Sequence, residues 1–157
     1  MPVHTLELLN LFFGGLLAGA EFAVRFGVRG AIGVLDQQPS IQLRQALIRS
    51  LRVAVPAVYV PTVLTGIAVT AWNGGGTGFA VQCAAVAAML VWTLATFAGT
   101  VPINAAVLDV WQADAPPADW QATISRWERL DTVRTCAAAV AFALFLTAVG
   151  LQLACGS

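Results

Sequence analysis

The sequence predicts an all-α fold, an integral membrane bundle of four helices. Of the 157 residues, 59% are hydrophobic and only 10% are charged, which is too apolar for an ordinary soluble domain. The apolar residues form four continuous stretches, each with the roughly 20 residues that a helix needs to cross the hydrocarbon core of a bilayer. Most of the charged residues lie between these stretches. We therefore expect the bilayer to be the main solvent of this protein, and membrane lipids to be partners.

The four expected spans belong to one domain, residues 1–157. They cover about residues 6–28, 51–72, 79–100 and 133–155, and a glycine-rich break at residues 73–78 separates the second from the third. The first stretch is too long for the apolar region of a signal peptide, and no Lys or Arg precedes it, so we expect it to stay in the mature protein. A β-barrel is disfavoured, because barrel strands alternate in polarity and these stretches do not.

The arginines predict the orientation of the chain in the cell membrane. There is no lysine, and all eight basic residues flank two of the connections between spans. Arg25, Arg29, Arg44, Arg49 and Arg52 flank the first of these connections, and Arg126, Arg129 and Arg134 flank the other. Because cytoplasmic loops are rich in basic residues, both long connections should be cytoplasmic and both termini outside. Anionic lipid headgroups suit this arginine edge, whereas nucleic acid is not suggested.

Amphipathic helical segments are predicted in both cytoplasmic connections. In the first, Pro39 and Ser40 open a helical pattern of alternating apolar and polar residues that leads directly into the second span. The second connection, residues 105–131, carries three tryptophans among acidic residues and is interrupted at Pro116 and Pro117. Such segments typically lie on the membrane surface, with tryptophan in the interfacial belt.

Metal and disulfide chemistry find little support in this sequence. Cys83, Cys136 and Cys155 lie in or at the ends of apolar stretches without a paired spacing such as C-x-x-C, which is typical of small buried side chains. Cys83 and Cys155 map to the same side of the membrane, so a disulfide between them is left open. His4 is the only histidine, and zinc, haem and iron sites usually draw on several His or Cys ligands. We therefore predict no metal site.

Glu21 is the most informative residue, because a charge inside the membrane is costly unless it is paired or lines a cavity. Arg25 follows it at i+4, so the first helix could neutralise its own charge. Nearby, Gly15 and Gly19 have the small-residue spacing of a close helix-packing surface. A purely structural pair and a pair that forms part of a site are both compatible with this pattern.

A second set of polar residues lies along the middle spans. Thr93, Thr96 and Thr100 share one face of the third span, and Tyr59 lies on the second. Counted from the arginine side, Glu21, Tyr59 and Thr96 are each about seven or eight residues deep, or about 10–12 Å at 1.5 Å per residue. We expect them to meet in one pocket that faces the cytoplasm. The simpler alternative for the threonines is helix packing through hydroxyl groups, without a ligand.

Four segments of the chain carry a resemblance to a known family. In order they are LLAGAEFAVRFGV, QLRQALIRSLRVAVPAVYVPTVLTG, TVPINAAVLDVW and DWQATISRWERLDTVRT, and a last apolar helix follows. The most distinctive pieces are the VPIN motif that ends at Asn104, and the Arg126-Trp127 pair followed by Arg134. Together these segments resemble the anthrone oxygenase-like membrane proteins, long described as a domain of unknown function. The resemblance covers nearly the whole chain.

The resemblance implies a four-helix membrane protein whose fungal relatives oxidise polyketide anthrones to anthraquinones with O2, without a recognised metal or flavin. Its motif positions nominate Asn104, Arg126, Trp127 and Arg134, with Glu21 as the acid of the first helix. This chain also departs from the family pattern. Many members have a proline, often a histidine-proline, after the first helix, and an asparagine or histidine near the end of the arginine-tryptophan segment.

At those two places this chain has Arg29-Gly30 and Asp131. Chemistry that depends on a histidine there is therefore not carried over. A mechanism can still be written as a hypothesis, because oxidation of an anthrone begins with removal of an acidic carbon-bound proton. Glu21 would be the base. The predicted catalytic residues are Glu21, Asn104, Arg126 and Arg134.

In this hypothesis Arg126 or Arg134, together with the amide of Asn104, stabilises a phenolate-like anion that reacts with O2 directly. Trp127 would stack on the flat rings. No cofactor is expected, with O2 as co-substrate and an aromatic small molecule as substrate. The predicted substrate-binding residues are Arg25, Tyr59, Thr96 and Trp127.

Membership of a family does not fix the reaction, so a non-catalytic function is kept as an alternative. The protein would then hold a quinone-like or lipid molecule in the Glu21 pocket. It could also act as an accessory subunit of a membrane complex or as a homo-oligomer, docking through the Gly15 and Gly19 face. A transporter is a weaker hypothesis, because the sequence shows no inverted repeats. Oxygen uptake with an aromatic phenol would favour an enzyme, and a ligand that co-purifies without turnover would favour binding.

Overall fold

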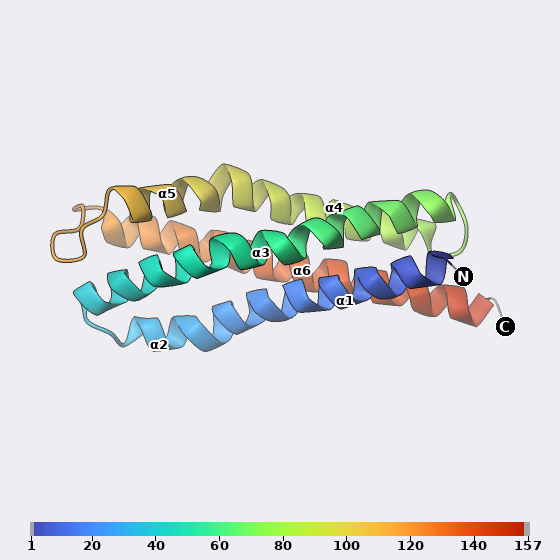
Figure 1. Cartoon of the computed structure of the whole chain (residues 1–157), viewed down its shortest axis with the longest axis horizontal. Helices are drawn as coiled ribbons and strands as arrows, with labels where there is room; N and C mark the ends of the chain where they lie inside the picture. Colours follow the sequence, from blue (N-terminus) through green and yellow to red (C-terminus); the bar gives the residue numbers. More distant parts are fainter. Residues whose placement is uncertain (1, 156–157) are drawn as a thin grey trace.

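The computed structural model describes residues 2–155 and consists of helices joined by short connections (Figure 1). In chain order the elements are α1 (Pro2–Phe22), η1 (Ala23–Val28), α2 (Arg29–Gly33), α3 (Gln37–Asn73), α4 (Phe79–Leu94), η2 (Ala95–Thr100), α5 (Val101–Asp109) and α6 (Trp120–Cys155). The two η elements are π-helical turns within longer helical rods. The part of the chain that the structure describes contains no strand, so the predicted all-α fold is confirmed.

These elements form four rods that are long and apolar enough to cross a membrane. The rods are Val3–Gly33, Gln37–Asn73, Phe79–Asp109 and Trp120–Cys155, and we number them one to four. The prediction of four membrane-spanning helices is therefore confirmed. The rods are longer than the spans expected from hydropathy. The 37 residues of α3 extend about 55 Å at 1.5 Å per residue, against about 30 Å for a hydrocarbon core.

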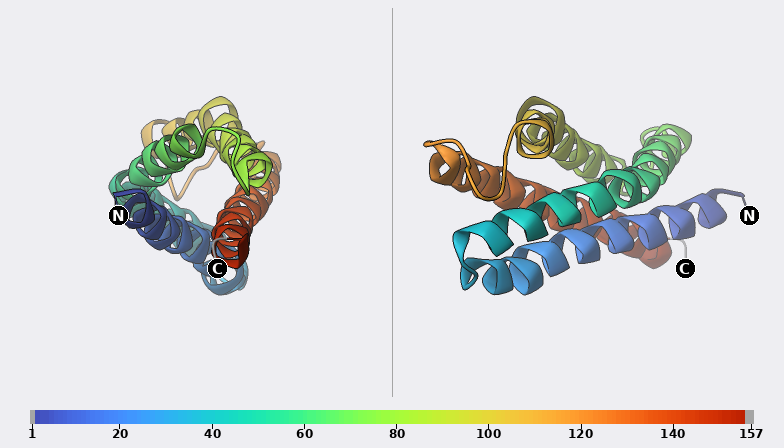
Figure 2. Two further views of the ribbon diagram at one scale, coloured as in Figure 1. Left: turned by 90° about the vertical axis from the view of Figure 1, so that its right-hand side faces the viewer. Right: turned by 60° about the vertical axis from the view of Figure 1, so that its left-hand side comes forward.

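The four rods pack side by side around a common axis, as the end-on view in Figure 2 shows. The most extensive packing joins α4 to α6 and α1 to α3, and α1 also packs against α6. The start of α1 and the end of α6 lie at one end of the bundle, while the α2–α3 and α5–α6 connections lie at the other (Figure 1). We call the latter the arginine end, because the arginines flank these two connections.

The segments expected to be amphipathic helices in the two connections largely continue the membrane-spanning rods. α3 begins at Gln37, so the first segment and the second span form one helix. In the other connection α5 ends at Asp109, residues 110–119 with their two prolines are not helical, and α6 begins at Trp120. A position of these segments on the membrane surface stays a prediction.

Two buried apolar clusters hold the rods together. The central cluster consists of Leu17, Ala85, Met89, Trp92, Ala137, Ala138, Ala141 and Phe145. The arginine-end cluster consists of Ile41, Ile48, Ile103, Val107, Trp111, Ile124 and Trp127. Across this second cluster, Nε2 of Gln45 donates to the main-chain oxygens of Val107 at 2.9 Å and of Trp111 at 3.1 Å. These hydrogen bonds tie α3 to the end of α5.

Gly66 is the site of a close helix contact inside the bundle. Of the predicted pair, Gly15 lies in a tight contact and Gly19 does not. A methyl group at Gly66 would lie 2.7 Å from the ring of Phe145. At Gly15 the nearest atom would be 3.3 Å away, in the ring of Phe142, and at Gly19 nothing lies within 4 Å. Gly19 therefore does not form a close-packing surface with the other described rods of this chain.

The three cysteines do not take the buried positions expected from the sequence. Cys83, Cys136 and Cys155 are free and exposed on the outside of the bundle, and no disulfide joins Cys83 to Cys155. The prediction of burial was wrong, because a helix that is apolar on every side gives no sign of which side turns inward. A thiol behaves as a small apolar group, so a face that lipid covers suits it.

Replacing Gly66 by alanine should destabilise the protein, because the buried ring of Phe145 has to move to make room for the new methyl group. We expect the free energy of unfolding to fall by about 1–3 kcal/mol, the usual cost of overpacking. The measurement is reversible unfolding by a denaturing detergent in mixed micelles. The matched control is Gly19→Ala, which should be neutral or slightly stabilising, because the position is open and alanine favours helix. Equal losses in the two variants would contradict the packing argument.

Candidate functional site

A cavity of about 260 Å³ lies inside the bundle, between the central cluster and the arginine-end cluster. This volume is slightly below the lower limit of about 300 Å³ for typical small-molecule pockets, so it suits a single compact ligand. All four rods contribute to its wall, which is mostly apolar. The polar wall residues are Glu21 on α1, Arg52 and Tyr59 on α3, Thr96 and Thr100 on η2, Asn104 on α5, and Asp131 and Arg134 on α6.

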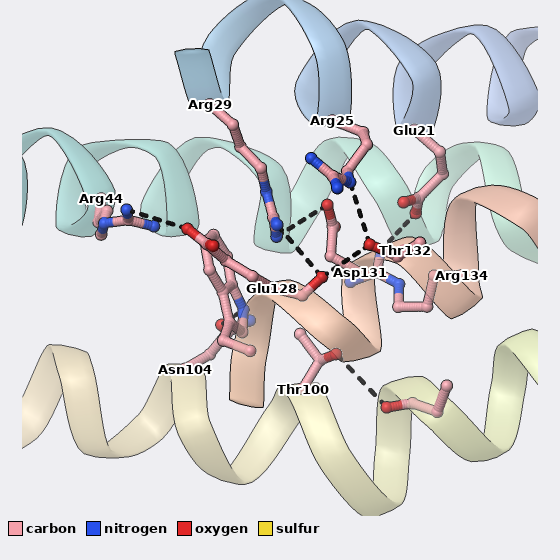
Figure 3. Close-up of polar contacts among 12 residues, drawn as sticks. Glu21, Arg25, Arg29, Arg44, Thr100, Asn104, Glu128, Asp131, Thr132 and Arg134 are labelled. Atoms are coloured by element: carbon pink, nitrogen blue, oxygen red, sulfur yellow. Dashed lines mark hydrogen bonds and ion pairs between the residues drawn. The ribbon is translucent and has the colours of Figure 1, made fainter. Parts of the chain in front are cut away.

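Glu21 is buried at this wall and forms an ion pair with Arg134 of α6 (Figure 3). Its Oε1 accepts a hydrogen bond from Nη2 of Arg134 and another from Nε1 of Trp92, the latter at 3.1 Å. The guanidinium of Arg134 also lies over the indole of Trp92, 4.8 Å from the ring centroid. Two side chains from two other rods thus stabilise the Glu21 carboxylate, a charge that would otherwise be costly inside a membrane.

The expected pair between Glu21 and Arg25 is not formed. Nε of Arg25 instead donates to Oγ1 of Thr132 at 3.0 Å. The cause is local, because the π-helical turn η1 begins at Ala23 and interrupts the 3.6-residue period that places i and i+4 on one face. Glu21 therefore finds its cation across the bundle and not along its own helix.

Some buried polar atoms of the wall residues have no hydrogen-bond partner within residues 2–155. They include Nε of Arg134 and Oδ2 of Asp131. The two hydrogen bonds to Glu21 both fall on Oε1, so Oε2 makes neither of them. Buried polar groups are normally hydrogen-bonded, and those that are not mark places where a ligand or water belongs. Oδ2 of Asp131 is in contact with Arg29. The wall therefore offers one donor, Nε of Arg134, and one acceptor, Oε2 of Glu21, to a molecule in the cavity.

A second ion pair lies closer to the arginine end. Nη2 of Arg29 lies 2.8 Å from Oδ2 of Asp131, and both side chains are buried. No hydrogen bond joins these two atoms, so the contact is one of charge. Nη1 of Arg29 donates to the main-chain oxygen of Glu128 at 3.2 Å, and Arg44 pairs with the carboxylate of Glu128 at 3.4 Å (Figure 3). α2 and α3 are thus both joined to α6 through charged groups.

Asn104 and Trp127 form a contact at the same side of the cavity. Nε1 of Trp127 donates to Oδ1 of Asn104 at 3.1 Å, which leaves the amide NH2 of Asn104 as a donor. The guanidinium groups of Arg29 and Arg44 lie over the ring of Trp127, at 4.9 and 5.5 Å from its centroid. Because these cations already occupy its ring surface, Trp127 has less free area for stacking than the sequence suggested. Its stacking on a substrate stays a prediction.

Tyr59 and Trp92 provide a stacked aromatic surface at the wall, with ring centroids 4.4 Å apart and planes inclined by 20°. The hydroxyl of Tyr59 lies 2.5 Å from Oγ1 of Thr93. Thr96 donates its hydroxyl proton to the main-chain oxygen of Trp92 at 2.9 Å. Its oxygen therefore remains as an acceptor for a ligand.

The structure brings six of the eight predicted site residues to the cavity and leaves two outside. Those at the wall are Glu21, Tyr59, Thr96, Asn104, Trp127 and Arg134. Arg126 is exposed in the second turn of α6, and Arg25 is half-buried, and neither lines the cavity. Of the two arginines suggested for stabilising an anion, the one at the cavity is Arg134. The chemical roles of all eight stay predictions.

Sequence reasoning missed Trp92, which contacts both members of the central ion pair. A signal was present in the sequence. Tryptophan in membrane proteins is enriched at the interfaces, whereas Trp92 lies in the middle of an expected span and four residues before Thr96, on the same helical face. A polar aromatic residue at that depth indicates a buried hydrogen bond.

Both π-helical turns border the cavity. η1 follows Glu21 directly and contributes Val24 to the wall, and η2 contributes Thr96 and Thr100. π-helical turns are rare and occur frequently at functional sites. No group of three or more His, Cys, Asp or Glu side chains within residues 2–155 is placed to hold a metal ion.

A sequence profile described as anthrone oxygenase matches residues 45–144, which is more than half of the chain. This chain belongs to the anthrone oxygenase family. No match was found among curated proteins or among solved structures. The matched region includes Trp92, Asn104 and Arg134 of the cavity wall, while Glu21 lies in the part of the chain before it.

Two departures of this chain from the pattern of the anthrone oxygenase family meet in space. They are the positions of Arg29 and Asp131, noted above for the sequence. In this chain the two side chains form the buried ion pair described above. Each charged residue therefore supplies the partner that the other needs, since a lone buried charge would be costly.

Removing either residue of the Arg29–Asp131 pair should lower the free energy of unfolding of the protein by about 3–5 kcal/mol, because the remaining buried charge loses its partner. In Arg29→Gln with Asp131→Asn together, the loss should be smaller than the sum of the two single losses. The measurement is a double-mutant cycle of unfolding free energies in mixed micelles. Arg49→Gln, at an exposed position of α3, serves as the control and should be near neutral. Strict additivity would show that the pair is not energetically coupled.

Proposed function

We propose that this protein is a cofactor-independent oxygenase that oxidises an aromatic polyketide or phenol with O2 in the cavity. The observation that carries the proposal is the buried Glu21–Arg134 ion pair at the wall of a mostly apolar cavity, with Nε of Arg134 unpartnered within residues 2–155. A carboxylate and a cation side by side suit a reaction that converts a neutral carbon acid into an anion. The family to which the chain belongs supports the same class of substrate.

The first step is removal of a proton from the CH2 group that joins two aromatic rings in an anthrone. Oε2 of Glu21 takes the proton. The electron pair left on carbon is delocalised onto the ketone oxygen of the central ring, which becomes a phenolate oxygen. Nε of Arg134 donates a hydrogen bond to that oxygen, and the amide NH2 of Asn104 provides a second donor. These donors stabilise the developing negative charge more than the neutral substrate, which is the condition for catalysis.

The anion then reduces O2 itself, so the reaction as written calls for no metal or flavin. A carbon–oxygen bond forms at the former CH2 carbon, and the resulting peroxide anion takes the proton from Glu21 and becomes a hydroperoxide. The Glu21 carboxylate then removes the remaining carbon-bound proton while the oxygen–oxygen bond breaks, which produces the ketone of the anthraquinone and a hydroxide ion. One oxygen atom of O2 ends in the new carbonyl group, and the other leaves as water with the two hydrogens. Glu21 returns its proton to the departing hydroxide, which restores the ion pair.

Glu21→Gln and Arg134→Gln should each lower the oxidation rate by at least about 100-fold, because each removes a group that acts on the reacting atoms. The measurement is O2 consumption by the detergent-purified protein with an anthrone and a small panel of hydroquinones. Matched controls are Glu7→Gln, a buried carboxylate outside the cavity wall, and Arg49→Gln, an exposed arginine on α3 outside the cavity wall. Both controls should retain the wild-type rate. A folded Glu21→Gln protein with full activity would rule out this assignment.

A second candidate is a membrane protein that binds a quinone-like or lipid molecule without turning it over, as an independent binder or as an accessory subunit. The stacked rings of Tyr59 and Trp92 favour a flat ligand in such a function. Absence of O2 uptake with every substrate, together with an aromatic molecule in the mass spectrum of the purified protein, would favour this candidate over the oxygenase.

A further inference from the structure

We propose that the substrate reaches the cavity from the hydrocarbon layer of the membrane, through a lateral opening between α3 and the facing η2–α5 segment. The substrate class is then a flat aromatic phenol that dissolves in lipid. The proposal rests on the proposed function for the reaction that follows, but the route itself depends only on the shape and surroundings of the cavity.

The cavity is closed along the bundle axis on both sides. Toward the arginine end it is covered by the arginine-end cluster, in which Ile41, Val107 and Trp111 are 0%, 2% and 7% exposed. The hydrogen bonds of Gln45 to α5 hold this cover in place. Toward the other end the central cluster begins with Trp92, which is 2% exposed. Buried side chains therefore cover the cavity toward both ends of the bundle.

The side of the bundle between the second and third rods is different. Apart from Ala20 of α1, the wall residues that are exposed on the molecular surface lie on these two rods. Val60 on α3 is 48% exposed, and on the opposite edge Phe97 and Val101 are 63% and 45% exposed. Residues that line a cavity and are also exposed mark its opening.

The two edges of the opening run side by side. Arg52, Pro56 and Val60 are spaced by four residues along α3, and Phe97 and Val101 have the same spacing on the other rod, so each set follows one side of its helix. α3 packs against α4 and α5 but makes little contact with η2 between them. The opening therefore lies beside the π-helical turn, where the two rods separate.

The depth of the opening places it within the lipid. Pro56, Val60 and Phe97 lie inside helices long and apolar enough to cross the membrane, and their neighbours on the outer surface are apolar. From Arg52 to Val60 the edge extends about 12 Å at 1.5 Å per residue. An apolar planar molecule can cross such an opening without passing through water, whereas an ionised one would have to leave its hydration shell. Arg52 marks the polar end of the opening, near the level of the headgroups.

The test follows the arrival of anthraquinone, a lipid-soluble molecule with the ring system of an oxidised anthrone, at the cavity of the full-length protein in phosphatidylcholine vesicles. Trp72, which is 63% exposed and outside the cavity wall, is replaced by phenylalanine in every protein compared, because a quencher in the lipid would reach it directly. Quenching of tryptophan fluorescence in a stopped-flow instrument then reports arrival at Trp92 and Trp127, which line the cavity. The test variant carries Val60→Phe and Val101→Phe, which narrow the opening from both edges. The matched control carries Ile67→Phe and Leu90→Phe, at exposed positions of α3 and α4 outside the cavity wall.

Narrowing the opening should slow association and dissociation by at least about tenfold each, with a much smaller change in affinity, because a gate acts on both rates. The control should match the wild type. Equal rates in all three proteins would overturn the lateral route, and absence of quenching in the wild type would overturn the substrate class as well. If the double variant does not fold, Val60→Phe against Ile67→Phe gives the same comparison. Because this readout involves no oxidation, binding through the opening without O2 uptake would contradict the proposed function alone and leave the route standing.

Discussion

The cost of charge inside a membrane is the constraint on which the arrangement of this bundle depends. Glu21, Arg29, Asp131 and Arg134 are all at least nine-tenths buried, and each finds its opposite charge on another rod. The fourth rod takes part in every one of these pairs, with Arg134, Asp131 and Glu128 facing the first and second rods. Sliding the fourth rod by a single helical turn, about 5.4 Å, would separate each cation from its carboxylate. Because a buried charge without its partner is costly, the ion pairs fix the register of the first and second rods against the fourth.

The same pairs account for the position of the cavity. Apolar side chains fill the bundle on both sides of the charged layer, in the central cluster and in the arginine-end cluster. Between them, charged groups face one another across the interior, and apolar side chains cannot fill the space around them without leaving those charges unsatisfied. The polar layer therefore joins the rods and also forms part of the wall of the cavity. A chemical role and a structural role fall on the same residues, which is why the stability and activity of Glu21 and Arg134 variants have to be measured separately.

Hydropathy and length were sufficient to predict the four spans, because a continuous apolar stretch of this length can cross a membrane only as a helix. Counting depth from the arginine side placed Glu21, Tyr59 and Thr96 at one level, and all three line the cavity. The partner of Glu21 was out of reach of such counting, because Arg134 lies on a different rod and the nearest arginine in sequence is Arg25. Local rules assume a regular helix, and the π-helical turn after Glu21 breaks that assumption. The burial of Cys83 was mispredicted for a related reason, since a uniformly apolar helix hides its orientation.

The turn η2 explains how residues spaced by four along the third rod can all line one cavity. Trp92, Thr96, Thr100 and Asn104 all line it, each four residues after the last. In a regular α-helix every step of four turns the side chain by about 40°, so Asn104 would point about 120° away from Trp92. The wider π-helical turn absorbs that drift and keeps both halves of the third rod facing one space. If this segment formed a regular α-helical turn with the same number of residues, Asn104, Ile103 and Val107 would rotate away from their partners. The backbone conformation of this turn, as much as the identity of any side chain, thus specifies the cavity.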